Sequence, residues 1–269
     1  MNLLNRQVGS AQSRHAAHLQ QGHFDALGES WLALMVGNSR WHWGQFLGST
    51  LQHQWDVPES IGFTSMPTDF NGAVVAASVV PNAVELLSSS VRLARPVRSL
   101  TLDDVPLQNM YPTLGIDRAL GVYGAGVTYG FPTIAIDAGT ALTITVANGD
   151  RELSGGAIMP GFGLQLRMLS EQTAGLPPVT VPSGALPERF ARGTADAIRS
   201  GVGYTLAAGI REFVSSWRSV NSNTSVVLTG GDSVALWRHL NLIAPDLAGC
   251  MECDPNVIFW GMRAVMERQ

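Results

Sequence analysis

The sequence predicts an α/β protein made of two similar halves, each with a mixed sheet flanked by helices. Short apolar runs alternate with segments of helical spacing along most of the chain. A short motif also occurs twice, about 100 residues apart, as Leu-Met-Val-Gly-Asn-Ser at 34–39 and Ile-Asp-Ala-Gly-Thr at 136–140. Each copy ends one predicted strand and turns into the next, as expected of a duplicated domain.

Length and composition agree with this fold class and exclude several functions. The chain has 269 residues, of which 45% are hydrophobic and only 14% charged, so much of it is expected to be buried. A formal net charge of -4 argues against nucleic-acid binding. No apolar stretch reaches about 18 residues, so no membrane span is predicted. Residues 1–28 lack a secretory signal and are expected to form a flexible polar extension. We therefore expect a cytoplasmic protein.

The first half is predicted to span residues 29–125 and to open with a β-hairpin. Apolar runs at 32–36 and 41–47 flank the turn Gly-Asn-Ser, and Trp41 and Trp43 alternate with polar residues as in a half-buried strand. The further elements expected here are a buried strand at 73–80, a helix at 82–94, an extended segment at 97–102 and a helix at 115–125.

The second half, residues 126–269, is predicted to open with a three-stranded meander. Its strands are 133–137, 141–147 and 152–159, with Asn148-Gly149 as a hairpin turn. The elements expected to follow are a helix at 161–172, a proline-rich loop at 177–187, a helical region at 189–220 broken near 201–203, a strand at 225–228, and helices at 232–240 and 256–267.

Three glycine turns are candidate nucleotide-binding segments, because each follows a buried strand. A turn with glycine and a small hydroxyl residue exposes backbone N–H groups that bind phosphate. Taken singly, each turn is also typical of an ordinary connection. No Walker or Rossmann fingerprint is present. The candidate ATP-binding residues are Val36, Gly37, Asn38, Ser39 and Arg40, then Gly139 and Thr140, then Thr229, Gly230 and Gly231.

The segment Gly115-Ile116-Asp117-Arg118 is a candidate catalytic motif at a helix start. An aspartate there can deprotonate a substrate hydroxyl, while the arginine binds a substrate anion. The alternative is a helix-terminal carboxylate in a surface ion pair. Other polar residues are expected to be structural: Cys250 and Cys253 as free thiols, and His42 and His239 without visible partners.

In this order, the motifs resemble the type III pantothenate kinase family from about Leu32 to Asp232. The most specific pieces are Gly115-Ile116-Asp117-Arg118, Asp137-Ala138-Gly139-Thr140-Ala141, the segment Gly155 to Gly161, Thr173-Ala174-Gly175-Leu176-Pro177, and the strand end Ala77 to Pro81. The resemblance implies two ribonuclease-H-like halves of the actin, sugar-kinase and Hsp70 type, with the nucleotide between them. It implies phosphorylation of pantothenate by ATP, the first step of coenzyme A biosynthesis, with Mg²⁺ and a monovalent cation (K⁺ or NH₄⁺). It also implies a homodimer.

The resemblance assigns roles to the candidate residues. Asp117 would be the general base, and Asp137 would help bind the monovalent cation. The substrate-binding residues would be Gly115, Ile116, Asp117, Arg118 and Thr173. A tyrosine expected ahead of the Gly-x-Asp-Arg motif is represented by Tyr111, at a shorter spacing than the family pattern.

Two further positions depart from the family pattern. Met35 stands where the first phosphate loop normally has aspartate, and Thr145 stands where the second often has one. A methionine cannot bind magnesium or its waters. Two alternatives to a pantothenate kinase therefore stay open: a catalytically impaired nucleotide-binding regulator of the same fold, and a kinase of another hydroxylated small molecule.

Overall fold

The computed structural model describes residues 30–67, 70–85 and 97–268. The polar extension at 1–28 and most of the helix expected at 82–94 lie outside the described residues. The described chain forms two compact units. The first unit contains the residues up to Pro106, Tyr111–Leu120 and the residues from Ile258 onward, and the second contains Leu107–Met110 and Gly121–Val257.

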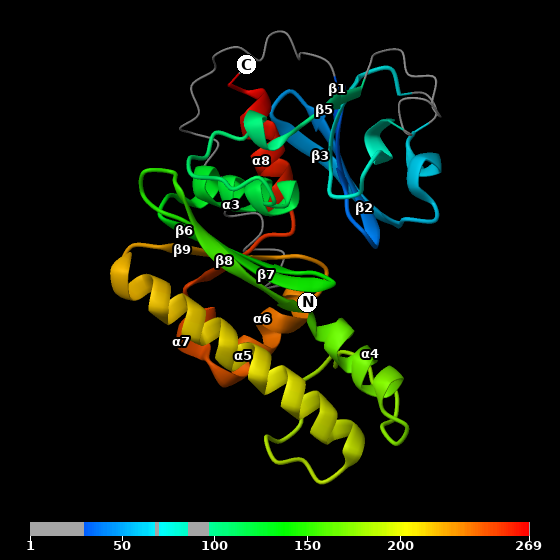
Figure 1. The fold of residues 1–269 in the computed structure, drawn as a ribbon, viewed down its shortest axis with the longest axis vertical. Coiled ribbons are helices and arrows are strands. Elements are labelled where there is room, and N and C mark those ends of the chain that lie inside the picture. The colour runs from blue at the N-terminus through cyan, green and yellow to red at the C-terminus, as the bar shows by residue number, and fades with distance from the viewer. Residues whose placement is uncertain (1–29, 68–69, 86–96, 269) are drawn as a thin grey trace. The chain divides into compact units, whose positions relative to one another are not determined.

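The first unit is built on a five-stranded mixed sheet (Figure 1). Its strands are β1 (Ser30–Val36), β2 (Arg40–Leu47), β3 (Thr50–Pro58), β4 (Ala73–Ser78) and β5 (Val97–Ser99), in the order β3-β2-β1-β4-β5. The β1–β2 and β2–β3 pairs are antiparallel, whereas β1–β4 and β4–β5 are parallel. Short 3₁₀ helices follow β3 and β5, at Gly62–Ser65 (η2) and Leu102–Asp104 (η3).

Both faces of this sheet carry buried aromatic side chains. One face carries an apolar cluster in which Trp43 stacks on Trp55 at 5.9 Å between ring centroids. On the other face, Trp31 stacks on Phe46 at 4.3 Å, and Phe46 meets the edge of Trp260 in helix α8 (Val257–Met266). The strand packing expected of Trp41 and Trp43 is confirmed, since both are buried.

The second unit repeats the topology of the first. Its strands are β6 (Thr133–Ala138), β7 (Ala141–Ala147), β8 (Leu153–Pro160), β9 (Ser225–Thr229) and β10 (Met251–Cys253), in the order β10-β9-β6-β7-β8. The pairs β6–β7 and β7–β8 are antiparallel, and β6–β9 and β9–β10 are parallel. Strands β6 to β10 therefore correspond one by one to β1 to β5, which confirms the duplicated α/β fold.

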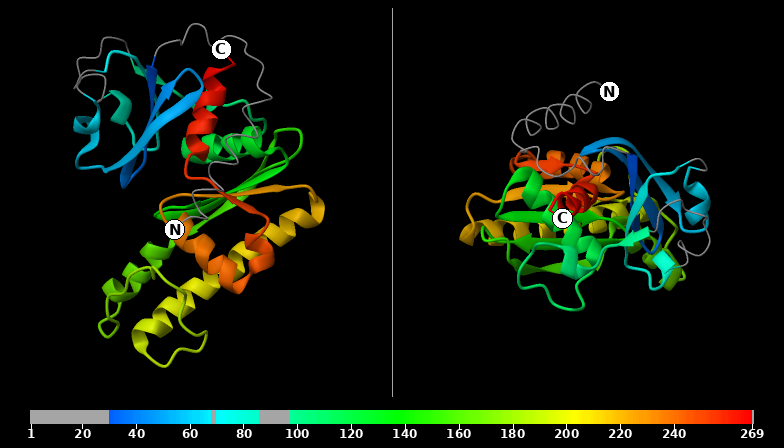
Figure 2. Two further views of the ribbon diagram at one scale, coloured as in Figure 1. Left: turned by 180° about the vertical axis from the view of Figure 1, so that it is seen from behind. Right: turned by 90° about the horizontal axis from the view of Figure 1, so that it is seen from above.

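Helices cover the second sheet and carry most of its core. Figures 1 and 2 show α5 (Thr194–Val220) and α6 (Ser233–Ile243) on one face, followed by the short α7 (Pro245–Ala248). Helix α4 (Phe162–Gln172) packs against α5, and α3 (Ile116–Tyr129) leads into β6. The cluster includes Ile136, Ile144, Leu206, Ile210 and Leu228, all nearly inaccessible to solvent. None of the helices that the structure describes is long and apolar enough to cross a membrane.

The structure corrects the expected break in the long helical region. Helix α5 begins at Thr194 and runs unbroken through Gly201 and Gly203 to Val220. A Cβ at Gly203 would collide with the side chain of Leu186. Because glycine has no side chain, the preceding loop can pack directly against the helix here. Packing of the buried residues on both sides, such as Val202 and Leu206, holds the helix continuous.

Candidate functional site

The first glycine turn connects β1 to β2 and is open to solvent. The N–H of Gly37 donates to the carbonyl oxygen of Arg40 at 3.0 Å, which closes the turn. A Cβ at Gly37 would lie only 3.0 Å from that same oxygen, so the tight turn favours glycine. Asn38, Ser39 and Arg40 are exposed to solvent.

The second glycine turn lies within a cluster of glycine segments in the second unit. The N–H of Gly161 donates to the carbonyl oxygen of Thr140 at 2.9 Å, and the N–H of Asp232 donates to that of Ala138 at 2.9 Å. Gly230 has a φ of +92°, and a Cβ there would collide with Oδ1 of Asp137. The structure thus brings together two turns that the sequence predicts separately, at 139–140 and 229–231.

Asp137 occupies the centre of this cluster. It is half-buried, and its cross-strand neighbours on the same face are Thr143 and Thr229. Carboxylate and hydroxyl oxygens are the donors that hard cations prefer, so the residues present fit a cation. Among the described residues, no group of three or more His, Cys, Asp or Glu side chains gathers as a metal site. A cation here would take its other ligands from phosphate and water oxygens.

The register of the two sheets makes Met35 the counterpart of Asp137. Met35 pairs with His42 of β2 and Ala77 of β4, while Asp137 pairs with Thr143 of β7 and Thr229 of β9. Both residues are penultimate in their strands. Met35 is 2% exposed, so its thioether is part of the packed interior. The first turn therefore lacks the carboxylate that the second one has.

Asp117 and Arg118 occupy the first turn of α3. The N–H of Arg118 donates to Oδ1 of Asp117 at 2.8 Å, and burial raises the pKa of the Asp117 carboxyl despite that hydrogen bond and the nearby guanidinium. A Cβ at Gly115 would collide with the same Oδ1. A Cβ at Gly261 of α8 would collide with the backbone of Leu120, so α8 fixes this end of α3. Asp117 is thus a partly buried acid in a defined position.

Arg118 is joined to Tyr111 despite the short spacing of the tyrosine from the motif. Arg118 is 9% exposed, and its Nη1 donates to the hydroxyl oxygen of Tyr111 at 2.9 Å. Tyr111 itself is 39% exposed. The structure therefore places this tyrosine beside the Gly-x-Asp-Arg motif, with its ring accessible from solvent.

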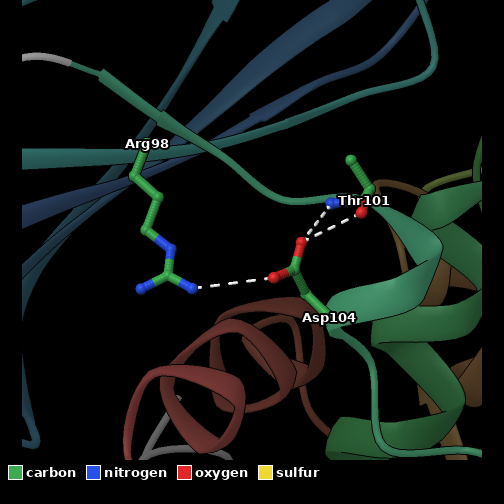
Figure 3. Close-up of polar contacts among 3 residues, drawn as sticks. All are labelled: Arg98, Thr101 and Asp104. Carbon is green, nitrogen blue, oxygen red and sulfur yellow. Dashed lines mark hydrogen bonds and ion pairs between the residues drawn. The ribbon is translucent and has the colours of Figure 1, made fainter. Parts of the chain in front are cut away.

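A pocket of about 700 Å³ opens in the first unit beside Gly115 and Ile116. Its walls come from the loop after β4, from the segment after β5 and from residues 112–116. Figure 3 shows how the second wall is held: Oδ2 of Asp104 accepts from the backbone N–H and hydroxyl of Thr101 at 2.8 and 3.0 Å. Nη2 of Arg98 lies 3.6 Å from the other carboxylate oxygen.

Thr173 lies away from the glycine cluster of its own unit. It follows α4, whose 11 residues extend about 16 Å from Gly161 at roughly 1.5 Å per residue. Its hydroxyl donates to the carbonyl oxygen of Leu169 at 2.5 Å, which leaves the hydroxyl oxygen as an acceptor. The structure does not join Thr173 to the segments at 139–140 or 229–231.

Three polar residues behave differently from the sequence expectation. His42 and His239 both have partners, contrary to expectation: Nδ1 of His42 lies 2.8 Å from Oδ1 of Asp56, and Nε2 of His239 lies 2.9 Å from the carbonyl oxygen of Gly184. Asp232 was not singled out as a site residue. Burial raises the pKa of its carboxyl, which lies directly after the glycine pair 230–231. That position is the signal that could have identified it. Cys250 and Cys253 are free thiols, as predicted.

Comparisons with known proteins agree on fold and family. Residues 31–216 match the sequence profile of the type III pantothenate kinase family. The type III pantothenate kinase of Nostoc sp. is 44% identical over 263 residues, covering 88% of this chain and 94% of the relative. That of Synechocystis sp. is 40% identical over 237 residues, covering 87% and 90%.

Solved structures show the same fold at lower identity. A Campylobacter jejuni protein described as a Baf family transcriptional activator superposes with a TM-score of 0.62 at 20% identity, covering 88% of this chain and 98% of that one. MreB5 of Spiroplasma citri bound to ADP gives a TM-score of 0.50 at 11% identity, covering 89% and 97%. The chain therefore shares its two-sheet α/β fold with these structures. With the family profile and the relatives together, the chain belongs to the type III pantothenate kinase family.

Proposed function

We propose that this protein transfers the γ-phosphoryl group of ATP to the primary hydroxyl of pantothenate, the first step of coenzyme A biosynthesis. Membership of the family supports this activity. The observation that carries it in the molecule is the partly buried carboxylate of Asp117, in a defined position beside Arg118 and Tyr111. A raised pKa suits a general base that must accept a proton near neutral pH.

In the proposed mechanism, Asp117 accepts the proton of the pantothenate hydroxyl as that oxygen attacks the γ-phosphorus, and the bond from this phosphorus to the β,γ-bridging oxygen breaks to release ADP. Arg118 and Tyr111 bind the polar part of the substrate, together with the backbone at Gly115 and Ile116, and Thr173 offers an acceptor. The pocket beside Gly115 has room for the rest of the molecule. Positioning of this kind supplies most of the rate in phosphoryl transfer.

The glycine turns bind the nucleotide in this proposal. The residues at 36–40 and at 139–140 hold phosphate oxygens through backbone N–H groups and hydroxyls, and those at 229–231 hold the adenosine. Asp137 holds a cation, K⁺ or NH₄⁺, and Mg²⁺ arrives with ATP. When bound, these ions neutralise the phosphate charge. The cluster of close backbone approaches around Asp137 supports this assignment, since a side chain at 230 would fill it.

A homodimer in the cytoplasm is the proposed working form. Large apolar side chains remain exposed on the second unit, among them Phe190 at 88% and Val220 at 76%. A two-fold dimer, the commonest symmetric assembly, could bury such side chains in a subunit contact. Light scattering coupled to gel filtration tests this point: a monomer at micromolar concentration would contradict it.

An assay of ADP release tests the activity. The protein should release ADP from Mg²⁺-ATP only when pantothenate is present, and faster in potassium than in sodium salts. An Asp117→Ala variant is the control. Release no faster than in that control, together with ATP binding by calorimetry, would favour the nucleotide-binding regulator that Met35 suggests. Faster release with a different hydroxylated acid would favour a kinase of another substrate.

A further inference from the structure

A polar row crosses the first sheet beside the position where a carboxylate is missing. Met35 of β1 pairs with His42 of β2, and His42 pairs with Asp56 of β3. Directly paired residues on neighbouring strands point to the same face, so the three side chains lie on one face. The equivalent row of the second sheet reads Asp137, Thr143 and Ile158. In the second sheet the acid, Asp137, thus stands on the central strand β6. In the first sheet the acid, Asp56, stands on β3, two strands from the central β1, and His42 on β2 lies between.

His42 and Asp56 form a defined pair. Nδ1 of the imidazole lies 2.8 Å from Oδ1 of the carboxylate. The hydrogen bond from His42, with the charges of His42 and Arg40 nearby, holds the pKa of the Asp56 carboxyl below its ordinary value. An ionised carboxylate cannot donate, so the proton of this bond belongs to Nδ1 of His42. Nε2 is then the ring atom left for another partner, and it can donate to a phosphate oxygen only when the ring is the cationic imidazolium, in which both nitrogens carry a proton.

The pair is accessible and lies near the first glycine turn. The side chains of His42 and Asp56 are 37% and 48% exposed, whereas Met35 is 2% exposed. His42 follows Arg40, the first residue after the turn, by two positions, about 7 Å along a strand. Residues two apart in a strand share a face, so Arg40 and His42 both lie on the face of Met35. Basic and polar groups therefore gather on this face just behind the turn.

We propose that His42, as the imidazolium cation, donates from Nε2 to the phosphates of the nucleotide, with Asp56 as the residue that positions its ring. In this arrangement, side-chain donors at the first turn hold phosphate oxygens where Met35 cannot hold a cation. The proposal rests on the proposed function, because it assumes that a nucleoside triphosphate binds at residues 37–39. It assigns to His42 a role in nucleotide affinity and none in binding the acceptor.

Calorimetry with Mg²⁺-ATP on the full-length protein tests the proposal. His42→Asn should weaken ATP binding roughly 10- to 100-fold, the loss expected for one charge-assisted hydrogen bond. His42→Gln keeps a donor near the place of Nε2 and should lose less. Asp56→Asn should weaken binding less than His42→Asn, and adding it to His42→Asn should cost little more, because it acts through the ring. His53→Asn, an exposed histidine on the strand of Asp56, is the matched control and should bind ATP like the parent.

Kinetics separate a binding role from a structural one. The KM for ATP should rise in His42→Asn while the KM for pantothenate stays within about twofold and the thermal midpoint falls by only a few degrees. ATP binding equal to that of the parent in a folded His42→Asn protein would overturn the proposal. So would equal losses of affinity for both substrates. Should the parent bind ATP without phosphorylating pantothenate, the proposed function would fail while the calorimetry still decides the role of His42.

Discussion

Replacing Asp117 by asparagine removes the proposed base with little structural change. The two side chains have nearly the same shape. In the parent, the backbone nitrogen of Arg118 lies 2.8 Å from Oδ1 of Asp117, and the asparagine Oδ1 can accept the same hydrogen bond. The close approach of Gly115 to that oxygen is also kept. The amide cannot accept the substrate proton. We expect kcat to fall roughly 10²- to 10⁴-fold, or about 3–5 kcal/mol, which is the usual contribution of a general base.

The pH profile of the parent gives a second measure of the same prediction. Burial raises the pKa of Asp117, and only its ionised form accepts a proton, so kcat/KM should fall with unit slope as pH drops through that raised pKa. The limb should lie above the ordinary aspartate range. The asparagine variant should lack the limb. A variant that keeps more than about a tenth of the parental kcat would refute the reasoning.

Asp117→Asn should lower activity without lowering the stability of the fold at neutral pH. Because the pKa of Asp117 is raised in the folded state, its contribution to stability is full below the ordinary aspartate pKa and is lost as pH rises through the raised value. Folding therefore disfavours the ionised form of the partly buried Asp117 carboxyl, and Asp117→Asn removes that ionisable group. The variant should be at least as stable as the parent in urea at neutral pH. A clear loss of stability there would show that the carboxylate is structurally required.

Three further variants test the phosphate and substrate segments. Gly230→Ala should abolish measurable ATP binding. A Cβ there collides with Asp137, and the φ of +92° costs a residue with a side chain about 1–3 kcal/mol in strain. Normal ATP affinity in calorimetry would contradict the role of this turn. Met35→Asp should lower the Mg²⁺ concentration needed for half-maximal activity, although burying a carboxylate at this position costs stability. An unchanged Mg²⁺ dependence would show that position 35 does not face the ion. Tyr111→Phe removes the hydroxyl that accepts the Arg118 hydrogen bond. It should raise the KM for pantothenate about tenfold and leave the KM for ATP unchanged. Equal changes in both KM values would argue against contact between Tyr111 and the substrate.

The duplicated fold could be predicted because its signals are local. The motifs at 34–39 and 136–140 end equivalent strands, and the full correspondence of five strands in each sheet confirms that duplication. Strand β3 was not predicted, since its residues alternate weakly and most are exposed. Strand β10 was also missed, because three residues carry too little periodicity. The expected break in α5 was wrong because glycine propensity is a weak term beside the burial on either side.

The candidate site likewise has a part that can be predicted from the sequence and a part that only the fold reveals. The Gly-x-Asp-Arg motif and the glycine turns are contiguous, so the sequence alone could identify them. The partners of His42 and His239 come from segments 14 and 55 residues away, which only the folded chain brings together. The joining of Tyr111 to Arg118 likewise depends on the path of residues 112–115 and not on spacing.

Identification of the reaction product tests the central claim most directly. Incubating the protein with ATP and pantothenate, followed by mass spectrometry and phosphorus NMR, should reveal ADP and pantothenate with one added phosphoryl group on its primary hydroxyl. The account predicts one phosphorylated pantothenate for each ADP formed, and none with Asp117→Asn on the same time scale. Unchanged pantothenate, or a product formed equally well by Asp117→Asn, would contradict it.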